Sequence, residues 1–267
     1  MSSPQGEVIL EAKDVTMQFG GLKAVDTFNI ALRKGELAGL IGPNGAGKTT
    51  VFNVLTGVYK PTKGDVHLCG VDIRPLKPFK ISHLGISRTF QNIRLFRDLS
   101  VIDNVLIAAH QHAEYTMLDS VLRLPKHFWG EAHLRKQALE LLHIFNLDKK
   151  ADYQAGGLPY GEQRKLEIIR ALATEPKMLF LDEPAAGMNH KETESLMETI
   201  AKIRKDFGLT VLLIEHDMKL VMGICERILV LDHGVTISQG NPEHVRKDPK
   251  VIAAYLGADF DQGVDRG

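Results

Sequence analysis

Residues 37–56 read LAGLIGPNGAGKTTVFNVLT, and this stretch decides the fold. The apolar run at 37–41 predicts a buried strand, and the residues from Lys48 to about Thr56 predict a helix. Between them, GPNGAGKTT satisfies the pattern G-x-x-x-x-G-K-[ST] of a phosphate-binding loop. Such a loop belongs to α/β architecture, where ligands bind at the carboxyl ends of parallel strands. We therefore expect an α/β fold built around a phosphate site.

Each residue type in this loop has a chemical reason. Glycines let successive backbone N–H groups curl around phosphate oxygens, and the following helix directs its positive end at them. Lys48 is expected to neutralise the β- and γ-phosphates of a nucleotide, and the Thr49 hydroxyl to ligate Mg²⁺. The predicted nucleotide-binding residues of the loop are Gly42, Pro43, Asn44, Gly45, Ala46, Gly47, Lys48, Thr49 and Thr50.

Two carboxylates follow a second apolar run, MLFLDE at 178–183. Asp182 suits a direct or water-mediated Mg²⁺ contact. Glu183 is then placed to polarise an attacking water as a general base. An acidic strand end in contact with solvent is the alternative, and the phosphate loop upstream disfavours it.

His216 follows a third apolar strand, VLLIE. Its place at the equivalent strand end predicts a contact with the γ-phosphate, where an imidazole would sense the phosphate and orient the water. A structural or merely solvated histidine is the alternative that the pattern leaves open.

The rest of the chain predicts a mostly parallel sheet with a helical insertion. The segment LDSVLRLPKHFWG contains Pro125, Trp129 and Gly130, which we expect to interrupt any single helix there. Strands are predicted near 8–10, 25–32, 66–68, 178–181, 211–214 and 228–231, and helices near 101–113, 131–146, 191–207 and 217–225.

Composition excludes several classes of protein. Of 267 residues, 33 are Lys or Arg and 33 are Asp or Glu, so a net charge of zero argues against a basic nucleic-acid-binding surface. The two cysteines, Cys69 and Cys225, are predicted to be ordinary buried thiols. No apolar run approaches the ~18 residues of a membrane span, and the first residues lack a signal-peptide pattern. We expect a cytosolic chain.

Further segments narrow the interpretation: Phe19 in TMQFGG, Gln91 in RTFQNIRLF, and LPYGEQRKLEIIRAL from Leu158. With GPNGAGKTT, MLFLDEP and LLIEHDM, in this order, the chain from about residue 7 to 257 resembles the nucleotide-binding subunits of ATP-binding cassette transporters. The resemblance implies a P-loop NTPase fold, in which a mostly parallel core sheet carries an antiparallel β subdomain and an inserted helical subdomain. It implies one ATPase domain over 1–257, with its core and β subdomain at about 7–91 and 173–257, its helical subdomain at about 92–172, and a flexible tail at 258–267.

The resemblance also implies roles for single residues. Phe19 would stack on adenine, and Gln91 would bridge Mg²⁺ or water to the helical subdomain. His216 corresponds to the switch histidine. The signature motif, which would face the nucleotide held by the opposite subunit, comprises Leu158, Pro159, Tyr160, Gly161 and Glu162. The implied catalytic residues are Glu183, His216, Lys48 and Gln91, and the implied metal ligands are Thr49, Gln91 and Asp182.

A narrower likeness follows from RTFQNIRLF, LDEPAAGMNHKET, LLIEHDMKLVMGICERI and the closing AYLG. These segments are similar to the ATPase subunits that energise import of branched-chain and other hydrophobic amino acids. That family implies ATP and Mg²⁺, two membrane permeases, a second ATPase in a head-to-tail dimer, and indirectly a periplasmic solute-binding protein, with no nucleic acid. It implies a location on the cytoplasmic face of the inner membrane. Urea uptake, lipopolysaccharide export and, less favoured, a non-transport cassette ATPase are the alternatives.

Two residues depart from the family pattern. Pro159 stands where a serine is usual, which removes a hydroxyl and a backbone N–H. We expect the ATP site that this signature completes to bind ATP less tightly or to turn over slowly. Asn189 stands where many cassettes carry aspartate, so a charge is lost. Three aromatic residues, Phe96, Phe128 and Trp129, are candidates for an exposed surface that faces the permease, although capping of the helical core is the alternative.

Overall fold

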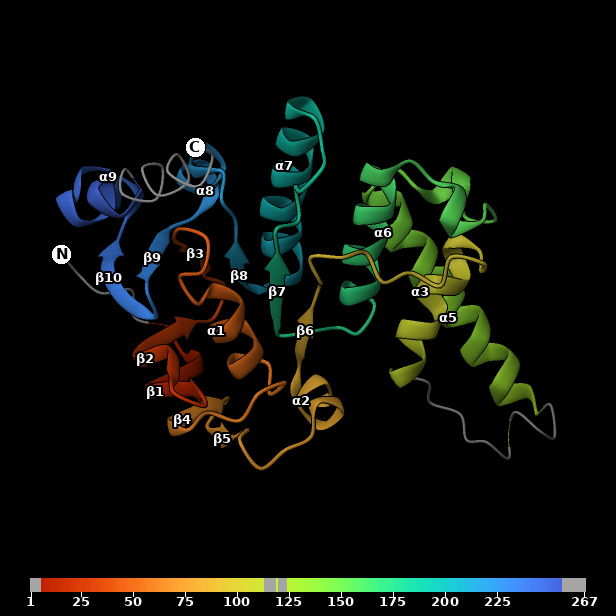
Figure 1. Ribbon diagram of the computed structural model, residues 1–267. Helices are drawn as coiled ribbons and strands as arrows, with labels where there is room; N and C mark the ends of the chain where they lie inside the picture. Colours follow the sequence, from red (N-terminus) through yellow and green to blue (C-terminus); the bar gives the residue numbers. More distant parts are fainter. Residues whose placement is uncertain (1–5, 113–118, 120–123, 256–267) are drawn as a thin grey trace. The chain divides into compact units, whose positions relative to one another are not determined.

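The computed structural model describes residues 6–112, 119 and 124–255, and these divide between two compact units (Figure 1). Unit 1 comprises Met1–Ile86, Lys177–Glu183 and Ala201–Gly267, and unit 2 comprises Ser87–Pro176 and Pro184–Ile200. Strand β6 (Ile86–Arg88) and helix α7 (His190–Phe207) each contribute residues to both units. The subdomain borders expected at about residues 92 and 172 stay a prediction, and the tail at 258–267 lies outside the described residues.

Unit 1 contains an antiparallel sheet of four strands in the order β2-β1-β4-β5. The strands are β1 (Val8–Phe19), β2 (Leu22–Arg33), β4 (Lys63–Leu68) and β5 (Val71–Asp72). β1 and β2 are longer than the sequence predicts, because both continue as partly exposed strands with bulges beyond their apolar runs.

A second sheet has the order β10-β9-β3-β8-β7-β6. β3 pairs in parallel with β8 and β9, and β7 pairs in parallel with β8. Among the strand pairs of this sheet whose register is described, only the pair of β10 and β9 is antiparallel. Besides β6, its strands are β3 (Leu37–Ile41), β7 (Met178–Asp182), β8 (Thr210–Ile214), β9 (Arg227–Asp232) and β10 (Val235–Gly240). The expected α/β class, with a mostly parallel core sheet and an antiparallel β part, is confirmed.

The central strands are covered on both faces, which explains their continuous apolar runs. Every residue of β3, β7 and β8 is buried. Phe52 of helix α1 (Lys48–Leu55) meets Phe180 of β7 edge to face, with ring centroids 5.1 Å apart. Gly39 of β3 lets helix α8 (Met218–Ile224) approach, since a Cβ there would lie 2.8 Å from Val221 Cγ1. Unit 1 also contains the short helices α2 (Pro78–Leu84) and α9 (Pro242–Lys247), and residues 249–255 are helical as well.

Unit 2 is mainly helical in its described part. In Figure 1 its helices α3 and α6 pack beside α5, in agreement with the contacts among these three elements. The helices and 3₁₀ turns are α3 (Val101–Ala109), η1 (His110–His112), α5 (Pro125–Ile144), η2 (Asp148–Lys150), η3 (Ala155–Gly157) and α6 (Tyr160–Leu172), together with the first part of α7. Leu134, Ala138 and Leu142, spaced four residues apart, are buried on one face of α5. Among the described residues, no helix is both long enough and apolar enough to cross a bilayer.

The expected interruption around Pro125, Trp129 and Gly130 is wrong. Helix α5 starts at Pro125 and passes through Trp129 and Gly130 without a break. Proline is compatible with the first helical position, because its missing N–H would have no partner there and its φ is already helical. Trp129 points to solvent, with 79% of its surface exposed.

The prediction of two buried thiols is also wrong for Cys69. This residue is exposed in the turn between β4 and β5, with a left-handed φ of 49°. Cys225 is buried against Gly39, and burial raises the pKa of its thiol to about 12.

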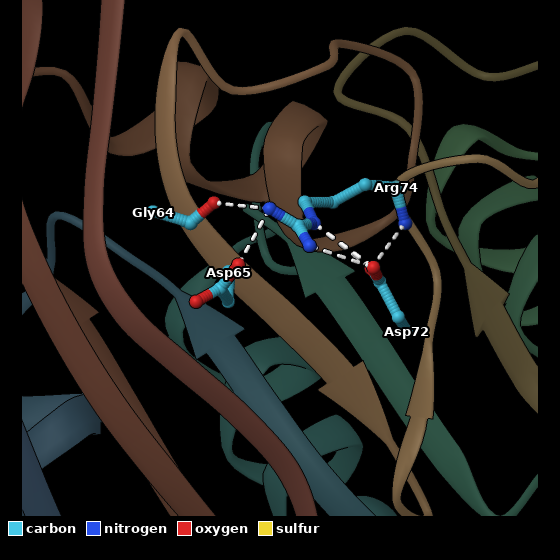
Figure 2. A network of polar contacts seen from close by, with 4 residues as sticks. All are labelled: Gly64, Asp65, Asp72 and Arg74. Atoms are coloured by element: carbon cyan, nitrogen blue, oxygen red, sulfur yellow. Dashed lines mark hydrogen bonds and ion pairs between the residues drawn. The ribbon is translucent and has the colours of Figure 1, made fainter.

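The β4–β5 hairpin is held by one guanidinium, shown in Figure 2. Arg74 donates from Nε and Nη2 to the two oxygens of Asp72 at 2.9 and 2.7 Å, and from Nη1 to the Gly64 carbonyl at 3.0 Å. Nη1 also lies 2.5 Å from Asp65 Oδ1. These hydrogen bonds lower the pKa of Asp72 from 3.8 to about 2.

The lowered pKa of Asp72 predicts a pH-dependent stability. Because the folded pKa is depressed, the carboxylate stabilises the fold above pH 3.8, and this contribution is lost as the pH falls through about 2. Asp72→Asn should therefore lower the free energy of unfolding at pH 6, and the difference from the parent should narrow between pH 4 and pH 2. Urea denaturation across this range measures the difference. Asp206→Asn, at an exposed position of α7, controls for the loss of one negative charge. If Asp72→Asn and the parent differed in free energy of unfolding by the same amount at every pH, the stabilising role of the Asp72 carboxylate would be contradicted.

The two cysteines should react differently with thiol reagents. At pH 8 the folded chain should release one equivalent of thionitrobenzoate from a disulfide reagent such as Ellman's, because only Cys69 is exposed, whereas Cys225 is buried with a pKa of about 12. Cys69→Ser should remove the native signal, and urea should expose the second thiol. Rapid reaction of both thiols in the folded parent would show that Cys225 is not protected.

Candidate functional site

The phosphate loop follows β3 and is held by close backbone contacts within unit 1. A Cβ on Gly42 would lie 2.0 Å from the Leu231 carbonyl oxygen, and a Cβ on Gly47 would lie 2.5 Å from that of Ala24. Gly47 also has a φ of 98°, which other residues adopt only with strain. The Gly234 N–H, in the turn between β9 and β10, donates to the Ala46 carbonyl at 2.9 Å. Neighbouring backbone therefore fixes the loop and requires glycine at two of its positions.

Helix α1 begins at the end of this loop, as Figure 1 shows. Gly47 is its N-cap and supplies no side-chain hydrogen bond to the first N–H groups, which have no partner inside a helix. Asn44, Gly45 and Thr49 are exposed along the loop. Free N–H groups at the positive end of a helix are well suited to bind an anion.

Lys48, the first residue of α1, folds back onto the loop. Its ammonium donates to the carbonyl oxygens of Gly42 at 2.7 Å and Pro43 at 2.8 Å. Burial lowers the pKa of Lys48, while the charges of Glu183 and Asp182 raise it. The structure thus brings Lys48 into the field of both predicted carboxylates.

The ends of β7 and β8 place the acidic residues and the histidine side by side. Asp182 is buried and pairs in register with Ile214. The Glu183 N–H donates to the Ile214 carbonyl at 2.9 Å, and Glu183 has a left-handed φ of 45°. Strain of this kind at a non-glycine residue is common at functional sites.

His216 is exposed beside these residues. Its Nδ1 lies 4.0 Å from Glu183 Oε2 and 3.7 Å from Glu215 Oε2. The structure therefore brings together the predicted base and the predicted switch histidine, although their roles stay predictions. Glu215 is almost fully buried, and the sequence does not single it out as a site residue because it stands at the end of the apolar run VLLIE.

Phe19 ends β1 and lies against a second aromatic residue. Its ring meets that of Tyr59 nearly edge to face, with centroids 5.4 Å apart and an interplanar angle of 77°. No sequence pattern points to Tyr59, because its contact with Phe19 joins residues that are far apart in the chain.

In unit 2, helix α6 holds the stretch that contains Gln91. Arg164 is buried and donates from Nη1 to the Phe90 carbonyl at 2.6 Å and from Nη2 to the Gln91 carbonyl. The same guanidinium pairs with Glu167 at 3.1 Å. Burial raises the pKa of Glu167, and the charge of Arg164 opposes this shift. The backbone at Gln91 is therefore anchored to the helix that begins in the signature segment.

The signature segment forms the start of α6. Pro159 is its N-cap, with an extended ψ of 151° and no side chain to cap the helix. Glu162 is engaged by Lys150, whose ammonium lies 2.7 Å from both carboxylate oxygens. Leu158 is buried, and Tyr160 packs near Gly187, where a Cβ would lie 2.8 Å from its ring. Gly161 lies next to Glu192, which a Cβ would approach to 3.4 Å.

Asn189, which is neutral where many cassettes carry aspartate, caps the start of helix α7. Its side chain accepts from the Glu192 N–H at 3.0 Å, and Glu192 accepts from the Asn189 N–H at 3.0 Å. This reciprocal pair is a capping box at the start of α7. Asparagine caps a helix as well as aspartate does, so the substitution preserves the cap.

Comparisons with known proteins agree with this geometry. The sequence profile of the family described as "ABC transporter" matches residues 25–186, and that of the "Branched-chain amino acid ATP-binding cassette transporter" matches residues 235–261. The high-affinity branched-chain amino acid transport ATP-binding protein LivG of Escherichia coli is 47% identical over 257 residues, which cover 96% of this chain and 99% of that protein.

Solved structures give the same result. An ATP-binding cassette of an ABC transporter, solved in its ADP conformation, superposes with a TM-score of 0.81 at 32% identity and covers 94% of this chain and 99% of its own. A dimeric cassette in a post-hydrolysis state, bound to ADP and phosphate, has a TM-score of 0.74 at 26% identity and covers 88% of this chain and 99% of its own. The chain therefore belongs to the ABC transporter family, as one of its ATP-binding subunits.

Proposed function

We propose that this chain is the ATP-hydrolysing subunit of an importer that drives uptake of branched-chain or other hydrophobic amino acids across the inner membrane. One observation carries the proposal: Lys48 of the phosphate loop lies in the field of Asp182 and Glu183, in a chain that is 47% identical to LivG over nearly its whole length. The profile match at 235–261 supports the amino-acid cargo over urea or lipopolysaccharide.

Binding of the triphosphate would use the loop in its present shape. The N–H groups at the start of α1 would receive phosphate oxygens, and the Lys48 ammonium would exchange the Gly42 and Pro43 carbonyls for the β- and γ-phosphates. Because the glycines already hold the loop, little reorganisation is needed. The adenine base would stack on Phe19.

The donor set at the loop suits Mg²⁺. Thr49 offers an exposed hydroxyl and Asp182 a carboxylate, and both present the oxygen ligands that Mg²⁺ prefers. Among the described residues, no three His, Cys, Asp or Glu side chains form a metal cluster. That suits an ion held mainly by phosphates and water with one or two protein oxygens, and Gln91 is proposed as a further ligand. When bound, the ion would neutralise charge on the phosphates.

Hydrolysis would use the two strand ends. Glu183 would accept a proton as the water oxygen attacks the γ-phosphorus, and the bond from that phosphorus to the β–γ bridging oxygen would break, which leaves ADP and phosphate. His216, 4.0 Å from Glu183, would orient the water and contact the γ-phosphate. General-base assistance of this kind contributes about 10²–10⁴-fold in rate.

We propose further that two ATPase subunits associate head to tail, each nucleotide being held between the phosphate loop of one subunit and the signature segment, 158–162, of its partner. The dimeric cassette bound to ADP and phosphate supports this arrangement. ATP would favour the closed dimer and its hydrolysis products the open one, so that coupling rests on a difference in affinity between two states. Two membrane permeases would receive the motion on the cytoplasmic face, and a periplasmic binding protein would deliver the solute.

The surface proposed to face the permease lies in unit 2. Phe96, Phe128 and Trp129 are all exposed, which favours a contact surface over the alternative that they cap the helical core.

Two substitutions test the ATPase assignment. Lys48→Ala should abolish ATP binding, because it removes the cation that faces the phosphates. Glu183→Gln should keep ATP binding but reduce hydrolysis by about 10²-fold or more, since the amide cannot accept the proton, and should trap a closed dimer. Calorimetry measures binding, phosphate release measures turnover, and light scattering measures the dimer.

Lys202→Ala and Glu198→Gln, at exposed positions of α7, are the matched controls and should behave like the parent. Hydrolysis by Glu183→Gln at a rate near the parental one would refute the base assignment. Absence of any ATP binding by the parent chain would refute the function itself.

The proline of the signature segment predicts a weakened composite site. Pro159→Ser restores a hydroxyl at the N-cap of α6, where no side chain now caps the helix, and should raise ATP affinity or turnover in the assembled transporter. Phosphate release in vesicles that contain both ATPase subunits and both permeases measures the effect. Unchanged ATPase activity would remove this role for Pro159.

A further inference from the structure

Two aromatic rings that are both partly exposed meet in unit 1. Phe19 is 43% exposed and Tyr59 is 37% exposed, although their rings are in contact at a centroid distance of 5.4 Å. Burial in the core therefore does not explain the pair. An exposed pair of large rings is a surface on which another flat apolar group can bind.

The backbone of Tyr59 is fixed on both sides. The N–H groups of Val58 and Tyr59 both donate to the Asn53 carbonyl, at 2.8 and 3.0 Å, so the segment is tied to helix α1. Just beyond it, the Thr62 N–H donates to the Thr16 carbonyl at 2.8 Å, which ties the chain to β1. Tyr59 thus sits on a rigid support, attached to the same helix that begins at the phosphate loop.

Phe19 has less support of its own. It is the last residue of β1, and Gly20 follows it with a left-handed φ of 56°. A phenyl ring at an exposed strand end can adopt several rotamers. The nearly perpendicular Tyr59 ring restricts that choice, because aromatic pairs prefer this edge-to-face arrangement.

We propose that Tyr59 is a positioning residue that holds the Phe19 ring ready to stack on the base of the bound nucleotide. The inference rests on the proposed function, in which Phe19 stacks on adenine. Ordering a side chain at the moment of binding reduces affinity, so a ring ordered beforehand binds more tightly. Tyr59 would therefore strengthen the part of the binding affinity that comes from contacts with the base. It would not change the part that comes from contacts between the phosphates and the phosphate loop.

The experiment separates these two shares by comparing ADP with inorganic pyrophosphate, which has no base. With Mg²⁺ present, Tyr59→Leu should raise the Kd for ADP about fivefold, which corresponds to about 1 kcal/mol at 1.4 kcal/mol per tenfold. The Kd for pyrophosphate should not change. Tyr59→Phe should restore ADP binding to within about twofold of the parent, because the ring makes the contact. In the assembled transporter, Tyr59→Leu should raise KM for ATP and leave kcat unchanged.

Two further variants complete the test. Tyr153→Leu replaces an exposed tyrosine of unit 2 and should leave both Kd values unchanged. In a Phe19→Leu background, Tyr59→Leu should add little to the loss of ADP affinity, since residues that act as a unit are not additive.

The possible failures differ from one another. If the parent binds neither ADP nor pyrophosphate, the proposed function fails and the inference fails with it. If the parent binds both and Tyr59→Leu binds ADP equally well, the inference alone is overturned. An equal loss of pyrophosphate binding, or additive effects of the two substitutions, would also overturn it, because Tyr59 would then support the fold rather than the Phe19 ring.

Discussion

The contact of the phosphate loop with neighbouring backbone carbonyls is the constraint on which the rest of the site depends. Gly42 and Gly47 approach Leu231 and Ala24 so closely that no side chain fits. This fixes where α1 begins, and α1 in turn carries Lys48 at its first residue and packs Phe52 on Phe180 of β7. Because β7 ends in Asp182, the same packing that orders the core brings Asp182 and Glu183 near enough to Lys48 for their charges to raise its pKa.

The parts of the site that the sequence predicts are those that local chemistry determines. A strand, a glycine loop and a helix follow one another within 37–56, and Glu183 and His216 each come directly after an apolar strand. Parallel strands end at one edge of a sheet, so the proximity of these two residues follows from the pattern. The cap formed by Asn189 and Glu192 is also local, and its spacing would have revealed it.

What the sequence does not reveal depends on contacts between distant segments. Arg164 binds carbonyls of Phe90 and Gln91, more than seventy positions away, and Tyr59 meets Phe19 across forty. No periodicity encodes such pairs. The predicted interruption of the helix around Pro125 is wrong for another reason. Proline and glycine usually end helices, but Pro125 occupies the first helical position, which favours proline. The packing of Leu134 and Leu142 outweighs the cost of Gly130 inside the helix.

Trp129 has a practical consequence for study of the assembled transporter. It is the single tryptophan of the chain and lies almost wholly in solvent on α5, in unit 2. Indole emission shifts to shorter wavelength when water leaves the ring. The chain therefore carries a native fluorescent reporter. Its emission wavelength would change if another macromolecule covered Trp129, and no dye or substitution is needed.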